Sequence, residues 1–494
     1  MLFGVNKVLE KFKNNKGLSH SSIYAIGSIT RQLVGFVMLP IYTSYLTPAN
    51  YGLIGLISFA IIIIEAVLGA RLMDAVPKFY HEQKELKNKH LVVSSAFWIT
   101  GVASSIIVIL MMLNSESIAK NVLGNAEYAL VFSLFAIQTL TQAIEYYGLL
   151  YMRIIEKPIL YLILNLSKLV VQVALNIWLV VYQELGVLGV AISGVVATAI
   201  FALIAGGYCI SKTGFGFNKT MGKKMFLFSW PLWLAGLGSI YITSSNRYYI
   251  NLFSSLDEVG LYELGAKFAI MLLVVMWMPF NEYWSNQRFK IYKEENAVDK
   301  FRNSFKVISA LLGLGCIGIS ILSVPVIYWM ADSSFHDAVK VVPILVIGMM
   351  FSSLADFYNF GFFAKSKTGM VTISSYISVA LVTVLYITLT PKYGYIGAAT
   401  SLMFVQITQF LYSYTFSQKY FKLDGIALHL IFVMIVTVGM IYYVNFYLYP
   451  GTDNIPLSEI VGRILLCGVA TLMLLARFAN LSQFRQVFKR NSDT

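Results

Sequence analysis

Residues 46–53 read Leu-Thr-Pro-Ala-Asn-Tyr-Gly-Leu and lie between the first two long apolar stretches of this 494-residue chain. A similar sequence, Ser-Ser-Leu-Asp-Glu-Val-Gly-Leu, occurs at residues 254–261, again between two apolar stretches. Aligning Gly52 with Gly260 places the two copies 208 residues apart. This offset indicates that the chain repeats itself.

A second pair of segments is related by the same offset. Residues 186–193 read Gly-x-x-Gly-Val-Ala-x-Ser, and residues 394–401 read Gly-x-x-Gly-Ala-Ala-x-Ser. In each, a glycine just past a short loop allows the next helix to begin close against the preceding one. The two matches predict two halves of six spans each, followed by two extra spans. Because each repeat has an even number of spans, the two halves have the same orientation and are related by an axis along the membrane normal.

The apolar stretches set the fold class. Each is near the roughly 20 residues that a helix needs to cross the hydrocarbon core. There are fourteen of them, at residues 20–46, 51–70, 91–113, 128–150, 159–182, 187–210, 225–252, 261–282, 305–329, 341–364, 371–390, 396–417, 426–449 and 459–476. We therefore predict an all-α polytopic membrane protein with fourteen transmembrane helices.

The predicted organisation follows from the repeat and the spans. It comprises a cytoplasmic amphipathic N-terminus at 1–19, a first lobe at 20–210, a cytoplasmic linker at 211–224, a second lobe at 225–417, two final spans within 426–476 and a cytoplasmic tail at 477–494.

Basic residues alternate between the two sides of these spans. The tails and every second loop hold 28 of the 37 lysines and arginines. The opposite loops hold only Lys120, Lys340 and Lys392. Because cytoplasmic loops retain Lys and Arg, both termini are predicted to be cytoplasmic.

Composition excludes several classes of function. Hydrophobic residues make up 58% of the chain and charged residues 12%, against about 25% charged in a typical soluble domain. The net charge of +13 fits loops that face an anionic inner leaflet, so we expect a lipid bilayer and no nucleic acid as a partner. The three cysteines and five histidines are scattered, and we find no nucleotide-binding glycine loop and no nucleophile motif. We expect no enzyme activity, no catalytic residue, no cofactor and no metal.

Three motifs carry a family resemblance. Residues 40–53 contain Pro-x-x-x-x-Tyr-Leu-x-Pro-x-x-Tyr-Gly-Leu, residues 246–250 read Asn-Arg-Tyr-Tyr-Ile, and residues 259–262 read Val-Gly-Leu-Tyr. The chain resembles the polysaccharide exporter and O-antigen repeat-unit flippase branch of the multidrug/oligosaccharidyl-lipid/polysaccharide (MOP) flippase superfamily. That branch often has an acidic residue before the arginine, where this chain has Asn246.

The resemblance implies a V-shaped fold of two lobes in the bacterial cytoplasmic membrane. It also implies that an undecaprenyl-diphosphate-linked oligosaccharide moves from the inner to the outer leaflet, for surface polysaccharide such as O-antigen or capsule. A polysaccharide polymerase is a further candidate partner on this resemblance.

Charges inside the predicted spans mark the candidate site, because a charge at the centre of a membrane helix costs about 2.5–3.5 kcal/mol. Arg31, Lys168 and Lys267 lie deep in their spans, whereas Arg247 lies near a span end. We predict that these four cations bind the substrate diphosphate in a central cavity between the lobes, where arginine can grip phosphate oxygens in bidentate fashion. The alternative is structural ion pairing, for which Lys267 has Glu263 one helical turn away.

Acidic residues in the spans have two interpretations. The set comprises Glu65, Glu145, Glu263 and Asp356. These carboxylates could couple transport to protons or sodium, or they could neutralise the buried cations.

Three functional hypotheses remain open at this stage. The preferred one is a lipid-linked oligosaccharide flippase that works by alternating access. A cation-coupled multidrug-type exporter would favour a cavity lined by carboxylates and about twelve spans. A membrane glycan polymerase or acyltransferase would need a sizeable outward loop or a histidine and acid site within the membrane, and the sequence has neither.

Overall fold

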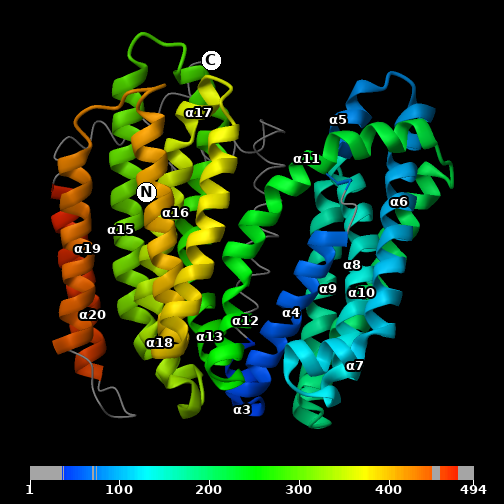
Figure 1. Cartoon of the computed structure of the whole chain (residues 1–494), viewed down its shortest axis with the longest axis horizontal. Helices are drawn as coiled ribbons and strands as arrows, with labels where there is room; N and C mark the ends of the chain where they lie inside the picture. Colours follow the sequence, from blue (N-terminus) through cyan, green and yellow to red (C-terminus); the bar gives the residue numbers. More distant parts are fainter. Residues whose placement is uncertain (1–35, 37, 69–71, 74, 448–456, 477–494) are drawn as a thin grey trace, which may run out of the picture. The chain divides into compact units, whose positions relative to one another are not determined.

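The computed structural model describes residues 36, 38–68, 72–73, 75–447 and 457–476 (Figure 1). Every regular element in these residues is a helix. The chain divides into two compact units, Met1–Ile240 and Tyr241–Thr494, and each is described here by itself. The lobe and linker boundaries expected from the sequence stay predictions.

The first unit is built from helices that run along the chain in the following order. They are α3 (Leu39–Tyr45), α4 (Pro48–Leu68), α5 (Ala75–Glu82), α6 (Leu86–Leu113), α7 (Ser115–Ile118), η1 (Ala119–Leu123), η2 (Ala126–Tyr128), α8 (Ala129–Ile154), α9 (Pro158–Asn176), η3 (Ile177–Tyr182), α10 (Gly186–Thr213) and α11 (Lys219–Ser244), the last of which crosses into the second unit.

The second unit continues from the end of α11. Its helices are α12 (Asn246–Phe253), α13 (Leu256–Leu272), η4 (Leu273–Trp277), α14 (Met278–Ile291), α15 (Ala297–Met330), η5 (Ser333–Lys340), α16 (Val342–Tyr358), α17 (Phe360–Ala364), α18 (Gly369–Ser417), α19 (Ala427–Tyr447) and α20 (Leu457–Ala476).

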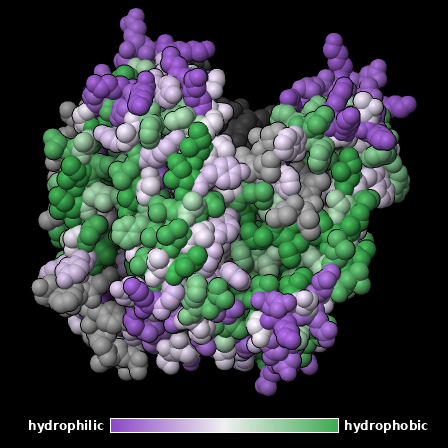
Figure 2. All heavy atoms as spheres, viewed as in Figure 1, coloured by the Kyte–Doolittle hydropathy of each residue, from purple (hydrophilic) through white to green (hydrophobic). Residues whose placement is uncertain are grey.

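The chain is a multi-pass membrane protein. Within the described residues, nine helices are long and apolar enough to cross a bilayer. Figure 2 shows hydrophobic residues over the middle of each unit and hydrophilic residues toward its upper and lower ends. The expectation of an all-helical membrane protein is confirmed, whereas the count of fourteen spans and the cytoplasmic termini stay predictions. Most of the first expected span, 20–46, lies outside the described residues.

Each of the repeated turns contains a glycine with a positive φ. Gly186 and Gly394, which align at the 208-residue offset, have φ of +52° and +54°. At Gly394, where ψ is −137°, the helix α18 breaks into two. The carboxylate of Glu258 accepts a hydrogen bond from the Tyr395 N–H at 2.8 Å and fills the space that a side chain on Gly394 would need. A residue other than glycine is therefore strained at Gly394.

Close packing in the first unit joins α8 to α10. Gly148 lies so near the backbone of Ala205 that a Cβ atom would overlap it. The hydroxyls of Thr141 and Thr198 lie 2.6 Å apart across the same two helices. Small residues of this kind let membrane helices approach closely, where dispersion and interhelical hydrogen bonds hold them. The face of α8 turned toward α10 is thus fixed, and other parts of its surface contact α6 and α9.

Two sets of polar contacts stabilise the second unit. Arg463 in α20 has a fully buried side chain that pairs with Glu459 at 2.6 Å and reaches the Ile321 carbonyl of α15 at 3.4 Å. At the start of η5, the Asp332 carboxylate accepts hydrogen bonds from the Ser334 N–H at 3.0 Å and from its hydroxyl at 2.8 Å. These bonds hold the pKa of Asp332 below its usual value.

Candidate functional site

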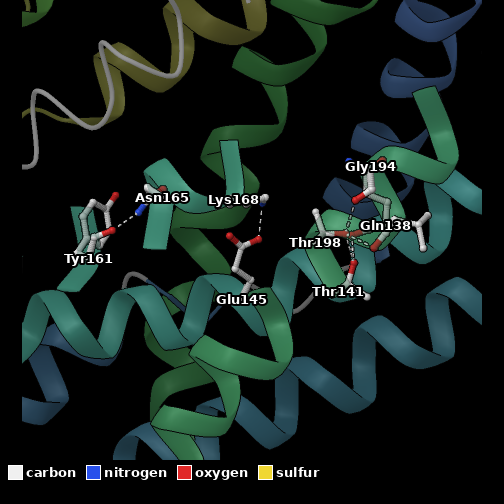
Figure 3. Close-up of polar contacts among 9 residues, drawn as sticks. Gln138, Thr141, Glu145, Tyr161, Asn165, Lys168, Gly194 and Thr198 are labelled. Carbon is white, nitrogen blue, oxygen red and sulfur yellow. Dashed lines mark hydrogen bonds and ion pairs between the residues drawn. The ribbon is translucent and has the colours of Figure 1, made fainter. Parts of the chain in front are cut away.

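A polar groove of about 350 Å³ lies between α8 and α9 of the first unit (Figure 3). This volume falls within the range of small-molecule sites, roughly 300–1,000 Å³. The lining residues are Gln142, Glu145, Tyr146, Leu149 and Arg153 from α8, and Tyr161, Asn165, Lys168, Leu169 and Gln172 from α9. Two residues predicted from the sequence, Glu145 and Lys168, are thus brought to one place.

Glu145 and Lys168 form an ion pair across this groove. The Lys168 Nζ lies 2.5 Å from the Glu145 Oε2, and Figure 3 shows the two side chains pointing toward each other. The Glu145 side chain is 8% exposed and the Lys168 side chain 20%. Lys168 lies ten residues beyond Pro158, the first residue of α9, which is about 15 Å along a helix axis. The pair therefore lies well inside the span, where each charge neutralises the other.

Arg153 occupies the C-terminal end of α8. Its Nη2 donates a hydrogen bond to the Tyr146 hydroxyl at 3.2 Å. Its guanidinium lies 5.6 Å from the centre of the Tyr146 ring and 5.8 Å from that of Tyr161, within the usual range of a cation–π contact. Among the residues that the structure describes, no carboxylate pairs with Arg153. Its positive charge is therefore held in place but not neutralised by a described side chain.

The polar residues of α9 share one helix face. Tyr161, Asn165, Lys168 and Gln172 recur at intervals of three and four residues, and side chains at this spacing are neighbours on the helix surface. Polar groups within a membrane span face protein or water, because hydrocarbon offers no hydrogen-bond partner. This face of α9 is thus suited to a hydrated cavity.

The part of α8 that precedes the groove residues is held against α10. The Thr198 hydroxyl donates to the Gly194 carbonyl at 2.8 Å and meets the Thr141 hydroxyl (Figure 3). Gln138 packs directly against Gly194, where a Cβ would overlap its amide. Since these contacts lie one to two turns before Glu145 on α8, they set the orientation of the groove-lining face.

A second charged group lies in the other unit. Arg247 forms an ion pair with Glu263, and its Nη1 also donates to the Asn246 Oδ1 at 3.2 Å. Asn246 in turn donates to the Tyr262 hydroxyl at 2.7 Å. Lys267, one turn along α13 from Glu263, interacts electrostatically with the same carboxylate. The Glu263 carboxylate therefore interacts with two of the cations predicted from the sequence, Arg247 and Lys267.

The remaining predicted residues are dispersed. Arg31 lies outside the described residues. Glu65 is half-buried in α4. Asp356 in α16 interacts electrostatically with Arg288 at the end of α14, and both side chains are partly buried. The roles of these residues in binding or coupling stay predictions.

Sequence reasoning missed part of the groove. In the sequence, Arg153 falls in a basic loop that is predicted to be cytoplasmic, and Gln142, Tyr161, Asn165 and Gln172 carry no charge that would mark them within a span. The helical spacing of polar residues along 161–172 is a signal that would have found the α9 half. The position of Arg153, two turns beyond Glu145 on α8, becomes informative only once the α8–α9 pairing is known.

Comparisons with known proteins agree with this architecture. Residues 18–282, more than half of the chain, match the family described as polysaccharide biosynthesis protein. A search of curated proteins finds no match. Among solved structures, the lipid II flippase MurJ in an inward closed conformation matches with a TM-score of 0.68 at 14% identity, covering 94% of this chain and 99% of MurJ.

Two further structures come from multidrug-type and archaeal transporters. An inward-facing multidrug resistance MATE family transporter of the MOP superfamily matches with a TM-score of 0.62 at 13% identity, covering 80% of this chain and 96% of that one. A MOP superfamily transporter from Pyrococcus furiosus matches with a TM-score of 0.53 at 12% identity, covering 85% and 95%. Likeness at these identities establishes the fold, and together with the family match it confirms the resemblance predicted from the motifs.

Proposed function

The chain belongs to the polysaccharide biosynthesis protein family and has the fold of MOP-superfamily transporters, and on this premise we propose that it translocates a lipid-linked oligosaccharide. The substrate is an undecaprenyl-diphosphate-linked repeat unit, which moves from the inner to the outer leaflet of a bacterial cytoplasmic membrane. The product supplies surface polysaccharide synthesis, with a polysaccharide polymerase as the downstream partner.

The observation that carries this proposal is the polar groove of α8 and α9 inside a membrane unit. A diphosphate cannot cross hydrocarbon unpaired, since burying an isolated charge costs far more than any single contact returns. Arg153 supplies a cation that no described carboxylate neutralises, and the amides in the groove supply hydrogen-bond partners for sugar hydroxyls. The polyprenyl chain needs no such site, because it can remain in lipid.

The membrane potential favours export of such a head group. Moving one negative charge outward down an inside-negative potential gains about 2.3 kcal/mol per 100 mV. Transport of an anionic substrate can therefore run without hydrolysis of a nucleotide. Protons or sodium, acting through Glu65, Glu145, Glu263 or Asp356, remain candidate coupling ions.

Export of organic cations is the second candidate, favoured by the likeness to a MATE family transporter. Such a substrate needs an unpaired carboxylate in its binding site. In the groove, Glu145 is already matched by Lys168, and Arg153 adds a further positive charge. This balance of charge supports an anionic substrate over a cationic one.

The test is a strain in which the chain is depleted. We expect surface polysaccharide to fall and lipid-linked oligosaccharide to accumulate in the inner leaflet, measured by surface labelling and by extraction of lipid-linked intermediates. The doubly substituted Arg31→Ala/Lys267→Ala protein should fail to restore export, whereas Lys392→Ala, which removes an exposed cation from a predicted outward loop, should restore it. Unchanged surface polysaccharide after depletion would refute the proposal.

A further inference from the structure

The groove carries one cation more than it has carboxylates to neutralise. Glu145 contributes one negative charge, and Lys168 and Arg153 contribute one positive charge each. Because Lys168 lies 2.5 Å from Glu145, that pair is neutral as a unit. The net charge of +1 in the groove therefore resides on Arg153.

We propose that the α8–α9 groove is a binding site for the phosphorylated sugar end of the substrate, with Arg153 contacting the phosphate and the rings of Tyr146 and Tyr161 packing on the first sugar. This inference rests on the proposed function and deepens it, since it assigns the substrate head group to named residues. It also assigns the main anion contact to a residue outside the set of cations expected from the sequence.

Arg153 is pre-organised for a phosphate. Arginine has five N–H donors in a planar fork that matches phosphate oxygens, and within the described residues the Tyr146 hydroxyl is the one acceptor it meets. The two tyrosine rings hold the guanidinium from its sides. The Arg153 side chain is exposed, and these contacts restrict its movement before an anion binds, which favours affinity.

The surroundings of Arg153 suit a sugar as well as a phosphate. Tyr146 is 41% exposed, so its ring offers an apolar face with a polar tip toward the groove. The amides of Gln142, Asn165 and Gln172 line the same space and can exchange hydrogen bonds with hydroxyls. Arg153 is at the end of α8, whereas the Glu145–Lys168 pair is two turns deeper. A head group would therefore meet the uncompensated charge first.

The experiment measures binding of two short-chain probes to the purified full-length protein in detergent. The probes are farnesyl diphosphate and its N-acetylglucosamine-bearing form, with farnesol as the uncharged control. Three variants separate the two cations: Arg153→Gln, the double variant Glu145→Gln/Lys168→Gln, and Arg153→Lys. The double variant keeps the groove at +1, whereas Arg153→Gln brings it to zero. Thermal unfolding of each variant verifies that it is folded.

We expect Arg153→Gln to weaken binding of both diphosphate probes about tenfold to a hundredfold, the value of a hydrogen-bonded charge contact. The double variant should bind close to the wild type, and Arg153→Lys should fall between them because lysine keeps the charge but not the fork. Tyr161→Leu should remove the preference for the glycosylated probe over farnesyl diphosphate.

Several outcomes would overturn the inference. They are wild-type affinity in Arg153→Gln, a loss in the double variant as large as that in Arg153→Gln, and no binding of either probe by the wild-type protein. The proposed function fails separately. If binding depends on Arg153 while depletion of the chain leaves surface polysaccharide unchanged, the site stands and the flippase assignment falls.

Discussion

Replacing Gly394 by alanine should destabilise the protein much more than the same change at the repeat-related Gly186. Both glycines have a positive φ near +50°, so both substitutions strain the backbone. Their surroundings differ. A Cβ on Gly186 would meet only a Leu46 methyl at 4.0 Å, whereas one on Gly394 would overlap the carboxylate of Glu258.

The magnitudes follow from these contacts. Gly186→Ala carries the strain of a left-handed residue, about 1–2 kcal/mol. Gly394→Ala carries a strain of about 1–3 kcal/mol at a φ of +54° and a ψ of −137°. It also displaces the Glu258 carboxylate from the Tyr395 N–H, and a hydrogen bond to a charged group contributes about 1.5–3 kcal/mol. We expect a total loss of about 2.5–6 kcal/mol for Gly394→Ala.

The assay measures the free energy of unfolding in mixed micelles by titration with SDS. A double-mutant cycle with Glu258→Ala isolates the overlap, because removal of that side chain leaves Gly394→Ala with backbone strain alone. The cost of Gly394→Ala should then fall toward that of Gly186→Ala. Equal costs for the two glycine substitutions, or a cost at Gly394 that Glu258→Ala leaves unchanged, would refute the reasoning.

Three further outcomes test other parts of the molecule. Lys168→Met should lower stability by about 1–3 kcal/mol, because it strands Glu145, and adding Glu145→Gln should restore most of the loss. Arg463→Leu should lower the free energy of unfolding by about 3–5 kcal/mol, because it leaves Glu459 unpaired. A loss in SDS titration no larger than that for substitution of an exposed arginine would contradict this. Asp332→Ala should cost about 0.5–2 kcal/mol at pH 7 through loss of its helix-capping bonds. Since the folded-state pKa of Asp332 is lowered from 3.8, its contribution is present above that value and disappears as the pH falls through the folded pKa, so wild type and variant should converge in acid.

Most of the helical architecture could be predicted from the sequence, because a span must be both long and apolar. The stretches 91–113 and 187–210 lie inside α6 and α10. The break at Gly394 was also marked in advance by the repeat. The expected seventh span, 225–252, instead comprises two helices, α11 and α12, which meet near Ser245.

The candidate site was harder to predict because its parts come from different helices. The sequence marks Lys168 by its depth in a span and Glu145 as a carboxylate within a span, but no rule of spacing joins residues 23 positions apart on separate helices. For Glu263, helical spacing indicated Lys267, and the structure adds Arg247 as its ion-pair partner. Arg153 is a different case. The rule that cytoplasmic loops retain basic residues accounts for its position in the sequence, so nothing in the sequence indicates that it lines a groove.

The two buried ion pairs differ in what they require of membrane insertion. Arg463 and Glu459 are four residues apart on α20, so one turn of nascent helix already neutralises both charges and the last span can partition into the bilayer alone. Glu145 and Lys168 are on consecutive helices, so α8 and α9 must leave the translocation machinery as a hairpin for either charge to be matched. Biogenesis of the first unit is therefore committed to cooperative release of these two spans.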